Sequence, residues 1–256
     1  MSQDRGERFR GKTADYSRSR PQYPQGIIDV LREEKALFTG AVVADIGSGT
    51  GKLAELFLRN DFRAVCIEPN PEMRLQASVD LKKYPGHTIM DGTAEKTGLG
   101  GHSVDLVVAG QAFHWFVPEE TRKEFMRILK PGGMVALIWN DRKESSNDFN
   151  SDYESICRTY SNGYHQSGSL ALDRKTIDSF FGGKVKVFTL ENAQELDLEG
   201  VKGRYFSASY ALKPNDTRYG EMLQAMSDAF SRHSHDGQVA LRYETRLFLG
   251  IPHKWG

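Results

Sequence analysis

Short apolar runs alternate with amphipathic stretches between about residues 40 and 140. Runs rich in Val, Ile and Ala are typical of buried strands, and apolar residues three or four positions apart are typical of helices. The alternation predicts βαβ units around a parallel sheet. The expected strands are 42–46, 64–67, 88–90, 104–109 and 134–139, and the expected helices are 52–59, 72–83 and 118–129.

The helix expected at 118–129 shows how the pattern assigns faces. Its apolar residues Phe125, Ile128 and Leu129 share one side, which should pack on the sheet. The charged residues Glu119, Glu120, Arg122 and Lys123 are expected on the remaining surface. Pro118 suits the first turn, and Pro131-Gly132-Gly133 ends the helix before the next strand.

The pattern changes after Trp139 to a polar segment that reads as an insertion rather than sheet core. Three tyrosines follow, Tyr153, Tyr160 and Tyr164, which form either a substrate cap or a core beneath a loop. Further on, two more strands are expected at 185–190 and 239–249. The helix between them has Met222, Met226, Ala229 and Phe230 on one face.

Composition narrows the class of protein. The chain has 256 residues, 39% of them hydrophobic, which favours one domain with an elaboration. The formal net charge of zero argues against a broad nucleic-acid surface, and no apolar run is long enough to cross a bilayer. Neither Cys66 nor Cys157 belongs to a Cys-x-x-Cys pair, so both are expected to be reduced structural thiols. We expect a cytoplasmic monomer or weak dimer without membrane or nucleic-acid partners.

Three glycines follow the first expected strand in the segment Asp45-Ile46-Gly47-Ser48-Gly49-Thr50-Gly51-Lys52-Leu53. A P-loop would need glycine at 46 and a hydroxyl at 53, where Ile46 and Leu53 stand. A dinucleotide fingerprint would need glycine or alanine at 52, and its pyrophosphate would be repelled by Asp45. The remaining pattern is an acidic residue two positions before Gly-x-Gly-x-Gly.

This pattern resembles the first motif of class I S-adenosylmethionine-dependent methyltransferases. An acid at the end of the strand suits a ligand with an ammonium and a sulfonium, because opposite charges attract. Glu68 ends the second strand, where a carboxylate can accept both ribose hydroxyls. Asp91-Gly92-Thr93-Ala94-Glu95 follows the third strand and is either the adenine edge of the site or an ordinary turn.

A second resemblance rests on the loop Gly110-Gln111-Ala112-Phe113-His114-Trp115-Phe116 after the fourth strand. Clustered rings at this edge of a sheet indicate a pocket wall. Together with Tyr16, Arg20-Pro21, Tyr23-Pro24 and Leu129-Lys130-Pro131-Gly132-Gly133, the loop resembles the type 11, trans-aconitate methyltransferase-like group. Segments in the C-terminal half, among them Trp139-Asn140-Asp141-Arg142 and Gly203-Arg204, extend the resemblance over nearly the whole chain.

The resemblance implies an α/β, doubly wound, mostly parallel seven-stranded sheet with an antiparallel last strand and a helical cap. It implies a lid at 1–35 and a methyltransferase domain at 36–256, with cap insertions at about 141–175 and 196–236. Expected cofactor-binding residues are Tyr16, Arg20, Tyr23, Asp45, Gly47, Ser48, Gly49, Gly51, Glu68, Pro69, Met73, Thr93, Ala94, Glu95, Gly110, Gln111 and Phe113. Expected substrate-pocket residues are His114, Trp115, Trp139, Arg142, Arg204 and Tyr210.

The expected reaction is in-line methyl transfer from S-adenosyl-L-methionine to a small molecule. His114 is either a base for a protonated acceptor or a residue that shapes the pocket, and Trp115 is expected in its wall. Arg142 and Arg204 would bind an acidic acceptor, such as a carboxylate, or lie on the surface. His233 and His235 lack further metal ligands nearby, so a polar helix end is expected there and no metal site. A nicotinamide-dependent oxidoreductase and a non-catalytic S-adenosylmethionine-binding regulator remain alternatives.

Overall fold

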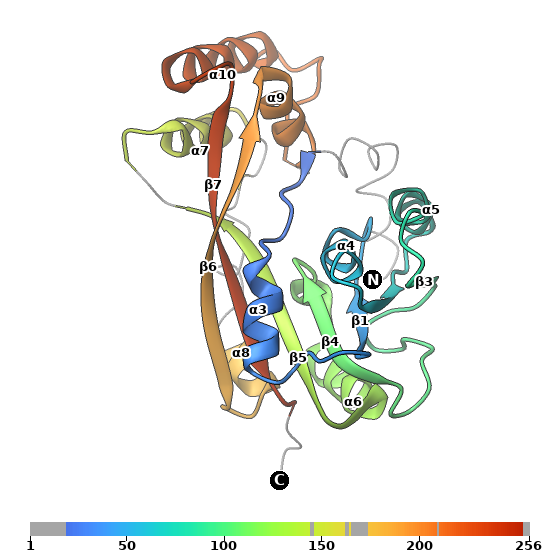
Figure 1. Ribbon diagram of the computed structural model, residues 1–256. Coiled ribbons are helices and arrows are strands. Elements are labelled where there is room, and N and C mark those ends of the chain that lie inside the picture. The colour runs from blue at the N-terminus through green and yellow to red at the C-terminus, as the bar shows by residue number, and fades with distance from the viewer. Residues whose placement is uncertain (1–18, 144–145, 162–163, 165–173, 209, 253–256) are drawn as a thin grey trace. The chain divides into compact units, whose positions relative to one another are not determined.

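The computed structural model describes residues 19–143, 146–161, 164, 174–208 and 210–252. Within this part of the chain lies a seven-stranded sheet with the strand order β3-β2-β1-β4-β5-β7-β6 (Figure 1). The strands are β1 Val42–Ile46, β2 Arg63–Ile67, β3 His87–Met90, β4 Val104–Gly110, β5 Leu129–Arg142, β6 Val185–Leu196 and β7 Val239–Gly250.

Most of the sheet is parallel, as the sequence predicts. Strand β1 pairs in parallel with β2 and β4, and the pairs β2–β3 and β4–β5 are parallel too. The last strand, β7, runs against its neighbours, as the arrows in Figure 1 show. The expected α/β fold with an antiparallel last strand is therefore confirmed.

The described residues form two compact units, which we call the sheet unit and the helical unit. The sheet unit falls within residues 23–140, 167–190 and 245–256, and the helical unit within 1–22, 141–166 and 191–244. The helices of the sheet unit are α3 Gly26–Glu33, α4 Lys52–Leu58, α5 Pro71–Asp80, α6 Pro118–Ile128 and α8 Arg174–Phe180. Those of the helical unit are α7 Phe149–Thr159, α9 Leu198–Phe206 and α10 Tyr219–His233.

The sheet unit has a hydrophobic core on each face of the sheet. Along β4, Leu106 and Val108 belong to one core cluster, while Val107 and Ala109 belong to the other. Successive strand residues point to opposite faces, so this alternation shows that β4 is covered on both sides. Helix α3, which the sequence analysis did not predict, joins the first cluster through its buried apolar residues.

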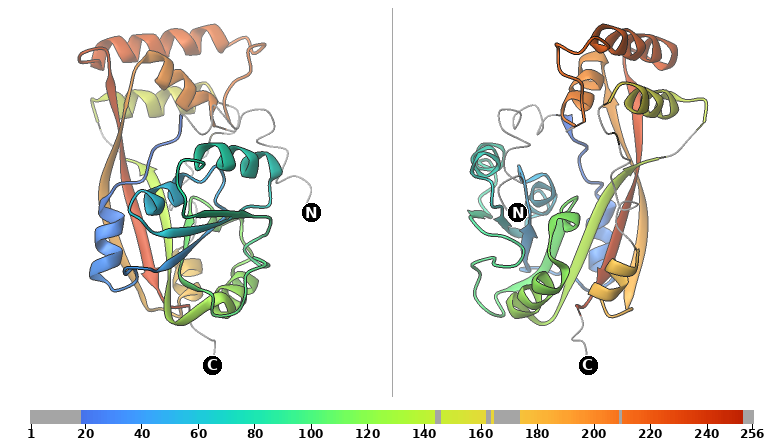
Figure 2. Two further views of the ribbon diagram at one scale, coloured as in Figure 1. Left: turned by 45° about the vertical axis from the view of Figure 1, so that its right-hand side comes forward. Right: turned by 180° about the vertical axis from the view of Figure 1, so that it is seen from behind.

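The helical unit has its own core. Helix α10 lies beside α7 and α9, as Figure 2 also shows. The predicted apolar face of α10 is confirmed, because Met222, Met226 and Ala229 are buried. Cys157 and Tyr153 on α7 belong to the same core cluster. Whether this unit acts as a cap, and residues 1–35 as a lid, stays a prediction.

Helix α6 shows a burial that the sequence pattern does not predict. Arg122 is expected away from the apolar face of this helix, and only 6% of it is exposed. The reason is α8, which packs against α6 and covers part of its polar side. Glu124 is also buried, and it accepts hydrogen bonds from the Thr97 backbone N–H at 2.8 Å and from Arg127 Nε at 2.7 Å. The side-chain hydrogen bond from Arg127 is the main cause that lowers the pKa of Glu124 to about 2.

Candidate functional site

The candidate site lies at the carboxyl edge of the parallel strands. The chain runs from β1 outward to β2 and β3, then returns to place β4 on the other side of β1. The connections after β1 and β4 therefore diverge, and such a switch point is where open α/β sheets bind ligands. The predicted donor-binding segments, apart from the N-terminal residues, follow the four strands β1 to β4 at this edge.

The glycine loop between β1 and α4 has a left-handed backbone at each glycine, with φ of 66° at Gly47, 55° at Gly49 and 82° at Gly51. A Cβ at Gly47 would lie 2.9 Å from Ala112 Cβ, and one at Gly51 would lie 2.7 Å from Leu81 Cδ1. At Gly49, none of the described atoms lies within 4 Å of such a Cβ. Gly47 and Gly51 therefore permit close packing, while Gly49 leaves the loop open to a ligand.

Asp45 lies beneath this loop with 1% of its surface exposed. Its Oδ2 accepts a hydrogen bond of 3.0 Å from the Ala54 N–H of α4, and its Oδ1 has no partner among the described residues. Burial raises the pKa of Asp45 to about 7, and the nearby Glu68 adds to the shift. A buried carboxylate oxygen without a donor suits a cationic or N–H-bearing ligand.

Glu68 follows β2 and connects the glycine loop to α5. Its Oε2 accepts from Gly49 N–H and its Oε1 from Asn70 N–H, both at 2.9 Å. Each carboxylate oxygen can accept a second hydrogen bond, so Glu68 keeps acceptor capacity for two hydroxyls. Burial raises the pKa of this carboxyl as well. Asn70 caps α5 by accepting from Met73 N–H at 3.2 Å.

The neighbouring residues Pro69 and Met73 lie at the start of α5. Met73 is almost fully buried, and Pro69 lies between Glu68 and the cap residue Asn70. Arg74, which the sequence analysis did not name, donates from Nη1 to the Glu68 carbonyl at 2.7 Å and to Asp91 at 2.9 Å. Arg74 thereby ties the ends of β2 and β3 together.

The segment after β3 is a closed turn. The backbone N–H groups of Thr93 and Lys96 each donate to the other residue's carbonyl, and Ala94 is buried. Glu95 accepts from the Val117 N–H at 2.9 Å, which links this turn to the start of α6. The sequence left an adenine edge and an ordinary turn open. The structure shows the turn, and the adenine contact stays a prediction.

The loop after β4 is held in an unusual conformation. Gln111 has a positive φ of 55°, and its Nε2 donates to the Asn140 carbonyl at 2.9 Å. The Tyr23 hydroxyl lies so close to Gly110 that any Cβ there would clash with it. Tyr23, which precedes α3, therefore lies at the carboxyl end of β4 within the sheet unit. Cofactor binding by Tyr23, Gly110 and Gln111 stays a prediction.

The rings of this loop divide between core and surface. Phe113 is buried and packs edge-on against Phe180 at 4.9 Å and Trp139 at 6.5 Å between ring centroids. Trp139 is fully buried, so the structure gives both residues a packing role in place of an open wall position. Trp115 is 40% exposed, with its ring 4.8 Å from that of His114.

His114 lies at the surface of the loop. Partial burial of the imidazole removes some of its hydration and thereby lowers the pKa of His114. The imidazole is therefore neutral at pH 7, with a nitrogen able to accept a proton. Both earlier interpretations, a base and a residue that shapes a pocket, remain compatible with this position.

The other predicted residues lie in the helical unit or outside the described part of the chain. Arg142, Arg204 and Tyr210 belong to the helical unit, and both arginines are largely buried rather than on the surface. Arg20 lies in the same unit, where its Nη2 donates to the Ser207 carbonyl at 3.4 Å. Tyr16 lies outside the described residues.

His233 and His235 were considered above as possible metal ligands. His233 ends α10 with its Nε2 2.9 Å from Asp152 Oδ2, as expected for a polar helix end. No group of three or more His, Cys, Asp or Glu able to hold a metal occurs in the ranges that the structure describes. Across those same ranges, none of the helices is both long and apolar enough to traverse a lipid bilayer.

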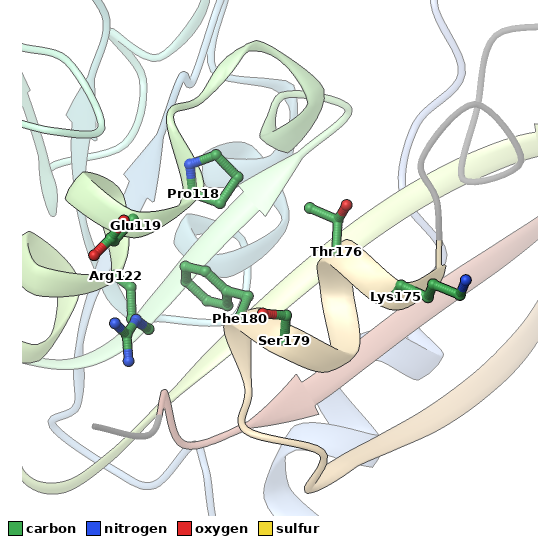
Figure 3. Close-up of a pocket in the computed structure, with 7 residues that line it drawn as sticks. All are labelled: Pro118, Glu119, Arg122, Lys175, Thr176, Ser179 and Phe180. Carbon is green, nitrogen blue, oxygen red and sulfur yellow. The ribbon is translucent and has the colours of Figure 1, made fainter. Parts of the chain in front are cut away.

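The sheet unit contains a hollow that the sequence does not predict. It has a volume of about 470 Å³ and lies between the start of α6 and α8 (Figure 3). It is lined by Pro118, Glu119, Arg122, Lys175, Thr176, Ser179 and Phe180. The expected polar face of α6 gave a partial signal for it, but the partner helix α8 did not stand out in the sequence.

Residues 44–137, from β1 into β5, match the model of the methyltransferase domain family. This segment of the chain is therefore similar to a methyltransferase domain. The matched residues include the glycine loop, Glu68, the 93–96 turn and the loop after β4. The match agrees with the family that the glycine motif indicated, and the trans-aconitate-like subtype stays a prediction.

Two curated relatives align with this chain over more residues than the domain model does. An uncharacterized methyltransferase-like protein of Schizosaccharomyces pombe is 36% identical over 138 residues, 54% of this chain and 53% of the relative. An uncharacterized methyltransferase of Mycobacterium tuberculosis is 38% identical over 136 residues, 53% of each chain. The chain thus spans about half the length of the curated relatives that it matches.

Solved structures share the fold over a longer part of the chain. A provisionally assigned type II methyltransferase from Anaeromyxobacter dehalogenans is 22% identical with a TM-score of 0.63, covering 91% of this chain and 99% of that one. The [4+2]-cyclase SpnF is 16% identical with a TM-score of 0.51, covering 90% and 82%. Since one of these neighbours is a cyclase, the fold by itself does not fix the reaction.

Proposed function

We propose that the protein transfers a methyl group from S-adenosylmethionine to a small-molecule acceptor. The observation that carries the proposal is Asp45, a buried carboxylate with one unpartnered oxygen among the described residues, at the switch point of a methyltransferase domain. The ionised form of Asp45 would disfavour a phosphate-bearing cofactor, because two negative charges repel at short range.

The residues at the site fit this donor. Asp45 Oδ1 can accept a hydrogen bond from the donor's ammonium group, and the open side of Gly49 permits close approach of the ligand. Glu68 keeps lone pairs for two ribose hydroxyls while its existing hydrogen bonds hold it in place. Pre-formed acceptors of this kind bind a ligand with little reorganisation.

When bound, the donor supplies a methyl group already activated by its positively charged sulfur. The protein's task is then to align the acceptor and exclude water, and only a protonated acceptor also needs a base. His114 can serve as that base, because loss of hydration lowers its pKa and leaves the ring neutral at pH 7. For an acceptor that carries a free lone pair, His114 would only shape the site.

Binding measurements test the donor assignment. Isothermal titration should detect S-adenosylhomocysteine and not NADH, and Asp45→Ala or Glu68→Ala should weaken binding by about 1–3 kcal/mol each, the value of a charged hydrogen bond. Asp29→Ala is the matched control, since Asp29 is an exposed acid on α3. NADH binding would revive the oxidoreductase alternative, and unchanged affinity in both site variants would refute the assignment.

Turnover separates an enzyme from a regulator. S-adenosylhomocysteine release should rise with at least one member of a panel of small hydroxyl, amine, thiol and carboxylate compounds. Donor binding without turnover on any acceptor would favour the non-catalytic alternative. With a working acceptor in hand, His114→Ala tests the base.

A further inference from the structure

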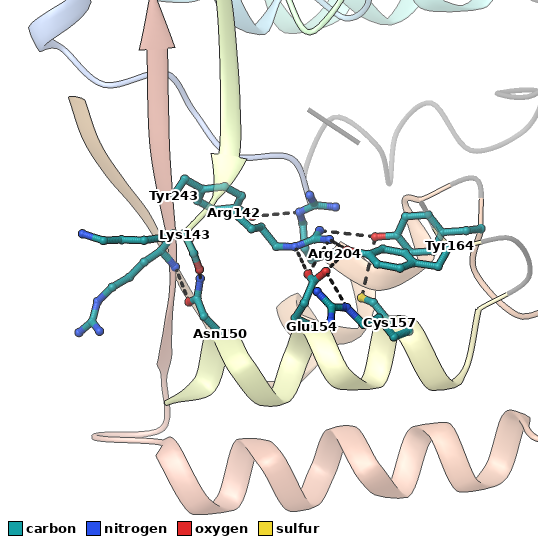
Figure 4. Close-up of polar contacts among 11 residues, drawn as sticks. Arg142, Lys143, Asn150, Glu154, Cys157, Tyr164, Arg204 and Tyr243 are labelled. Atoms are coloured by element: carbon teal, nitrogen blue, oxygen red, sulfur yellow. Dashed lines mark hydrogen bonds and ion pairs between the residues drawn. The ribbon is translucent and has the colours of Figure 1, made fainter. Parts of the chain in front are cut away.

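The helical unit contains a buried cluster of arginines and tyrosines, which we call the Arg–Tyr cluster. It is drawn in part in Figure 4. The strands β5 and β7 and the helices α7 and α9 all contribute to it. Its members are Arg142, Tyr153, Glu154, Tyr164, Arg204, Tyr210 and Tyr243.

Arg142 is fully paired within the cluster. Its Nε donates to Glu154 Oε2 at 3.1 Å, and its Nη2 donates to the Tyr164 hydroxyl at 2.6 Å. Glu154 therefore neutralises the charge of Arg142. Glu154 also accepts a hydrogen bond from the Tyr164 hydroxyl and pairs with the more exposed Arg158 at 3.6 Å. Within the described part of the chain it forms no ion pair with Arg204, the other buried arginine of the cluster.

Arg204 is the cation that the cluster leaves without a counter-ion. It is 5% exposed, and its Nε and Nη1 donate to the hydroxyls of Tyr243 at 3.1 Å and Ser207 at 3.4 Å. Throughout the described ranges it makes no ion pair with a carboxylate, and its Nη2 makes no hydrogen bond. A guanidinium cannot give up its charge, so a buried one without an anion is costly.

Tyr153 provides a second unmet group at the same place. The residue is completely buried, and its hydroxyl has no partner in the part of the chain that the structure describes. The Arg142 guanidinium lies 5.5 Å from the Tyr153 ring centre. Tyr153 also belongs to the same core cluster as Tyr243, the hydrogen-bond partner of Arg204. The cluster therefore holds an unpaired cation and an unpaired O–H donor together.

We propose that Arg204 and Tyr153 bind the carboxylate of a small monocarboxylic acid. The free edge of the guanidinium matches a planar carboxylate with two N–H groups, and the Tyr153 hydroxyl can donate to the same group. One surplus positive charge balances one carboxylate, whereas a phosphate would leave negative charge unpaired. The rings of Tyr164 and Tyr210, which pack edge-on with centroids 4.9 Å apart, add apolar surface to the cluster.

Binding to the whole chain tests this proposal without a methyl donor, so it stands or falls independently of the proposed function. The probes are acetate, butyrate and phenylacetate, with phenylacetamide as the uncharged isostere of the last and with inorganic phosphate as a competing anion. Titration calorimetry and the ligand-induced change in melting temperature give two readouts. We expect at least one acid to bind, and the amide and phosphate not to bind.

Two substitutions locate the site. Arg204→Met should abolish binding of the acid, and Arg204→Lys, which keeps the charge but loses the fork, should weaken it about tenfold or more. Tyr153→Phe removes only an unpartnered hydroxyl, so the unliganded protein should be no less stable, yet the dissociation constant should rise about tenfold. Tyr219→Phe is the control, because that ring stacks on Phe206 elsewhere in the same unit.

A purely structural role for Arg204 would lower the melting temperature of its variants and leave the Tyr153→Phe protein with wild-type affinity. If Arg204→Met fails to fold, the affinities of Tyr153→Phe and Tyr219→Phe for the acid still test the proposal, because only the first substitution should weaken binding. The proposal is overturned if none of the acids binds, if phenylacetamide binds as well as phenylacetate, if phosphate binds in their place, or if Tyr153→Phe has no effect on affinity.

Discussion

Replacing Asp45 by Asn should stabilise the fold while it weakens donor binding. Burial raises the pKa of this carboxyl from 3.8 to about 7, a difference of about three units or about 4 kcal/mol of unfolding free energy. Because the folded-state pKa lies above the unfolded one, the penalty is absent below about pH 4. It grows as the pH rises toward 7 and is complete above that value.

The amide removes this penalty but adds its own cost. The oxygen of the introduced amide would still accept the hydrogen bond from Ala54, while its buried N–H₂ group would lack an acceptor, at about 1–3 kcal/mol. The net expectation is a gain of about 1–3 kcal/mol at pH 8, which shrinks with falling pH and reverses between about pH 4.5 and 6, where the remaining penalty equals the cost of the amide. Urea unfolding followed by circular dichroism at pH 4.5, 6 and 8 would measure it.

Asp29→Asn, at an exposed position, should leave stability almost unchanged at each pH. In the wild type, donor affinity should increase between pH 6 and 8, because the ionised form of Asp45 attracts the donor's ammonium. The reasoning is refuted if Asp45→Asn is no more stable than the wild type at pH 8, or if its stability difference does not vary with pH.

Three further changes probe the sheet unit. Glu124→Gln should cost about 1–3 kcal/mol of unfolding free energy at pH 7, and the cost should fall as the pH drops from 4.5 toward 2, since the lowered pKa of Glu124 stabilises the fold only while the group is ionised. Denaturant titration of both proteins at pH 7 and again between pH 4.5 and 2 measures this difference in unfolding free energy. Gly51→Ala should lower stability by about 1–3 kcal/mol, because its φ is positive and its Cβ would press on Leu81, and thermal unfolding measures the loss. His114→Ala should reduce turnover about 100-fold or more with a hydroxyl acceptor, whereas near-normal turnover at saturating acceptor would rule out the base.

The sequence predicts the sheet well where strands are buried on both faces. Strand β1 has the expected bounds, and β4 extends the expected range by one residue, because continuous apolar runs mark such strands. Strand β6 continues to Leu196, six residues beyond the expected end. Its second half alternates exposed and half-buried positions, with polar residues that local pattern reading assigns to a loop.

The sequence predicts the helices, and the contacts between them, less completely than the strands. Helix α3 carries Ile27, Ile28 and Leu31 at helical spacing and joins the core of the sheet unit, whereas the resemblance implies a lid for residues 1–35. The burial of Arg122 on α6 depends on packing by α8, a contact between segments about 50 residues apart in the sequence. Single-sequence periodicity shows which face of a helix is apolar, but not which distant helix covers the polar one.

The difference between local sequence pattern and long-range packing also separates the proposed donor site from the Arg–Tyr cluster. The residues proposed for the donor follow strand ends within short motifs, so strand order alone brings Asp45, Gly49 and Glu68 together at one edge. The two arginines looked equivalent in the sequence, and the structure separates them. Arg142 is neutralised by Glu154, twelve residues away on the next helix. Among the residues that the structure describes, Arg204 donates to the hydroxyls of Tyr243 and Ser207 and forms no ion pair with a carboxylate. Charge balance among buried groups is a property of the assembled core. A ligand site that depends on an unmatched charge therefore becomes visible only when every neighbour of that charge is known.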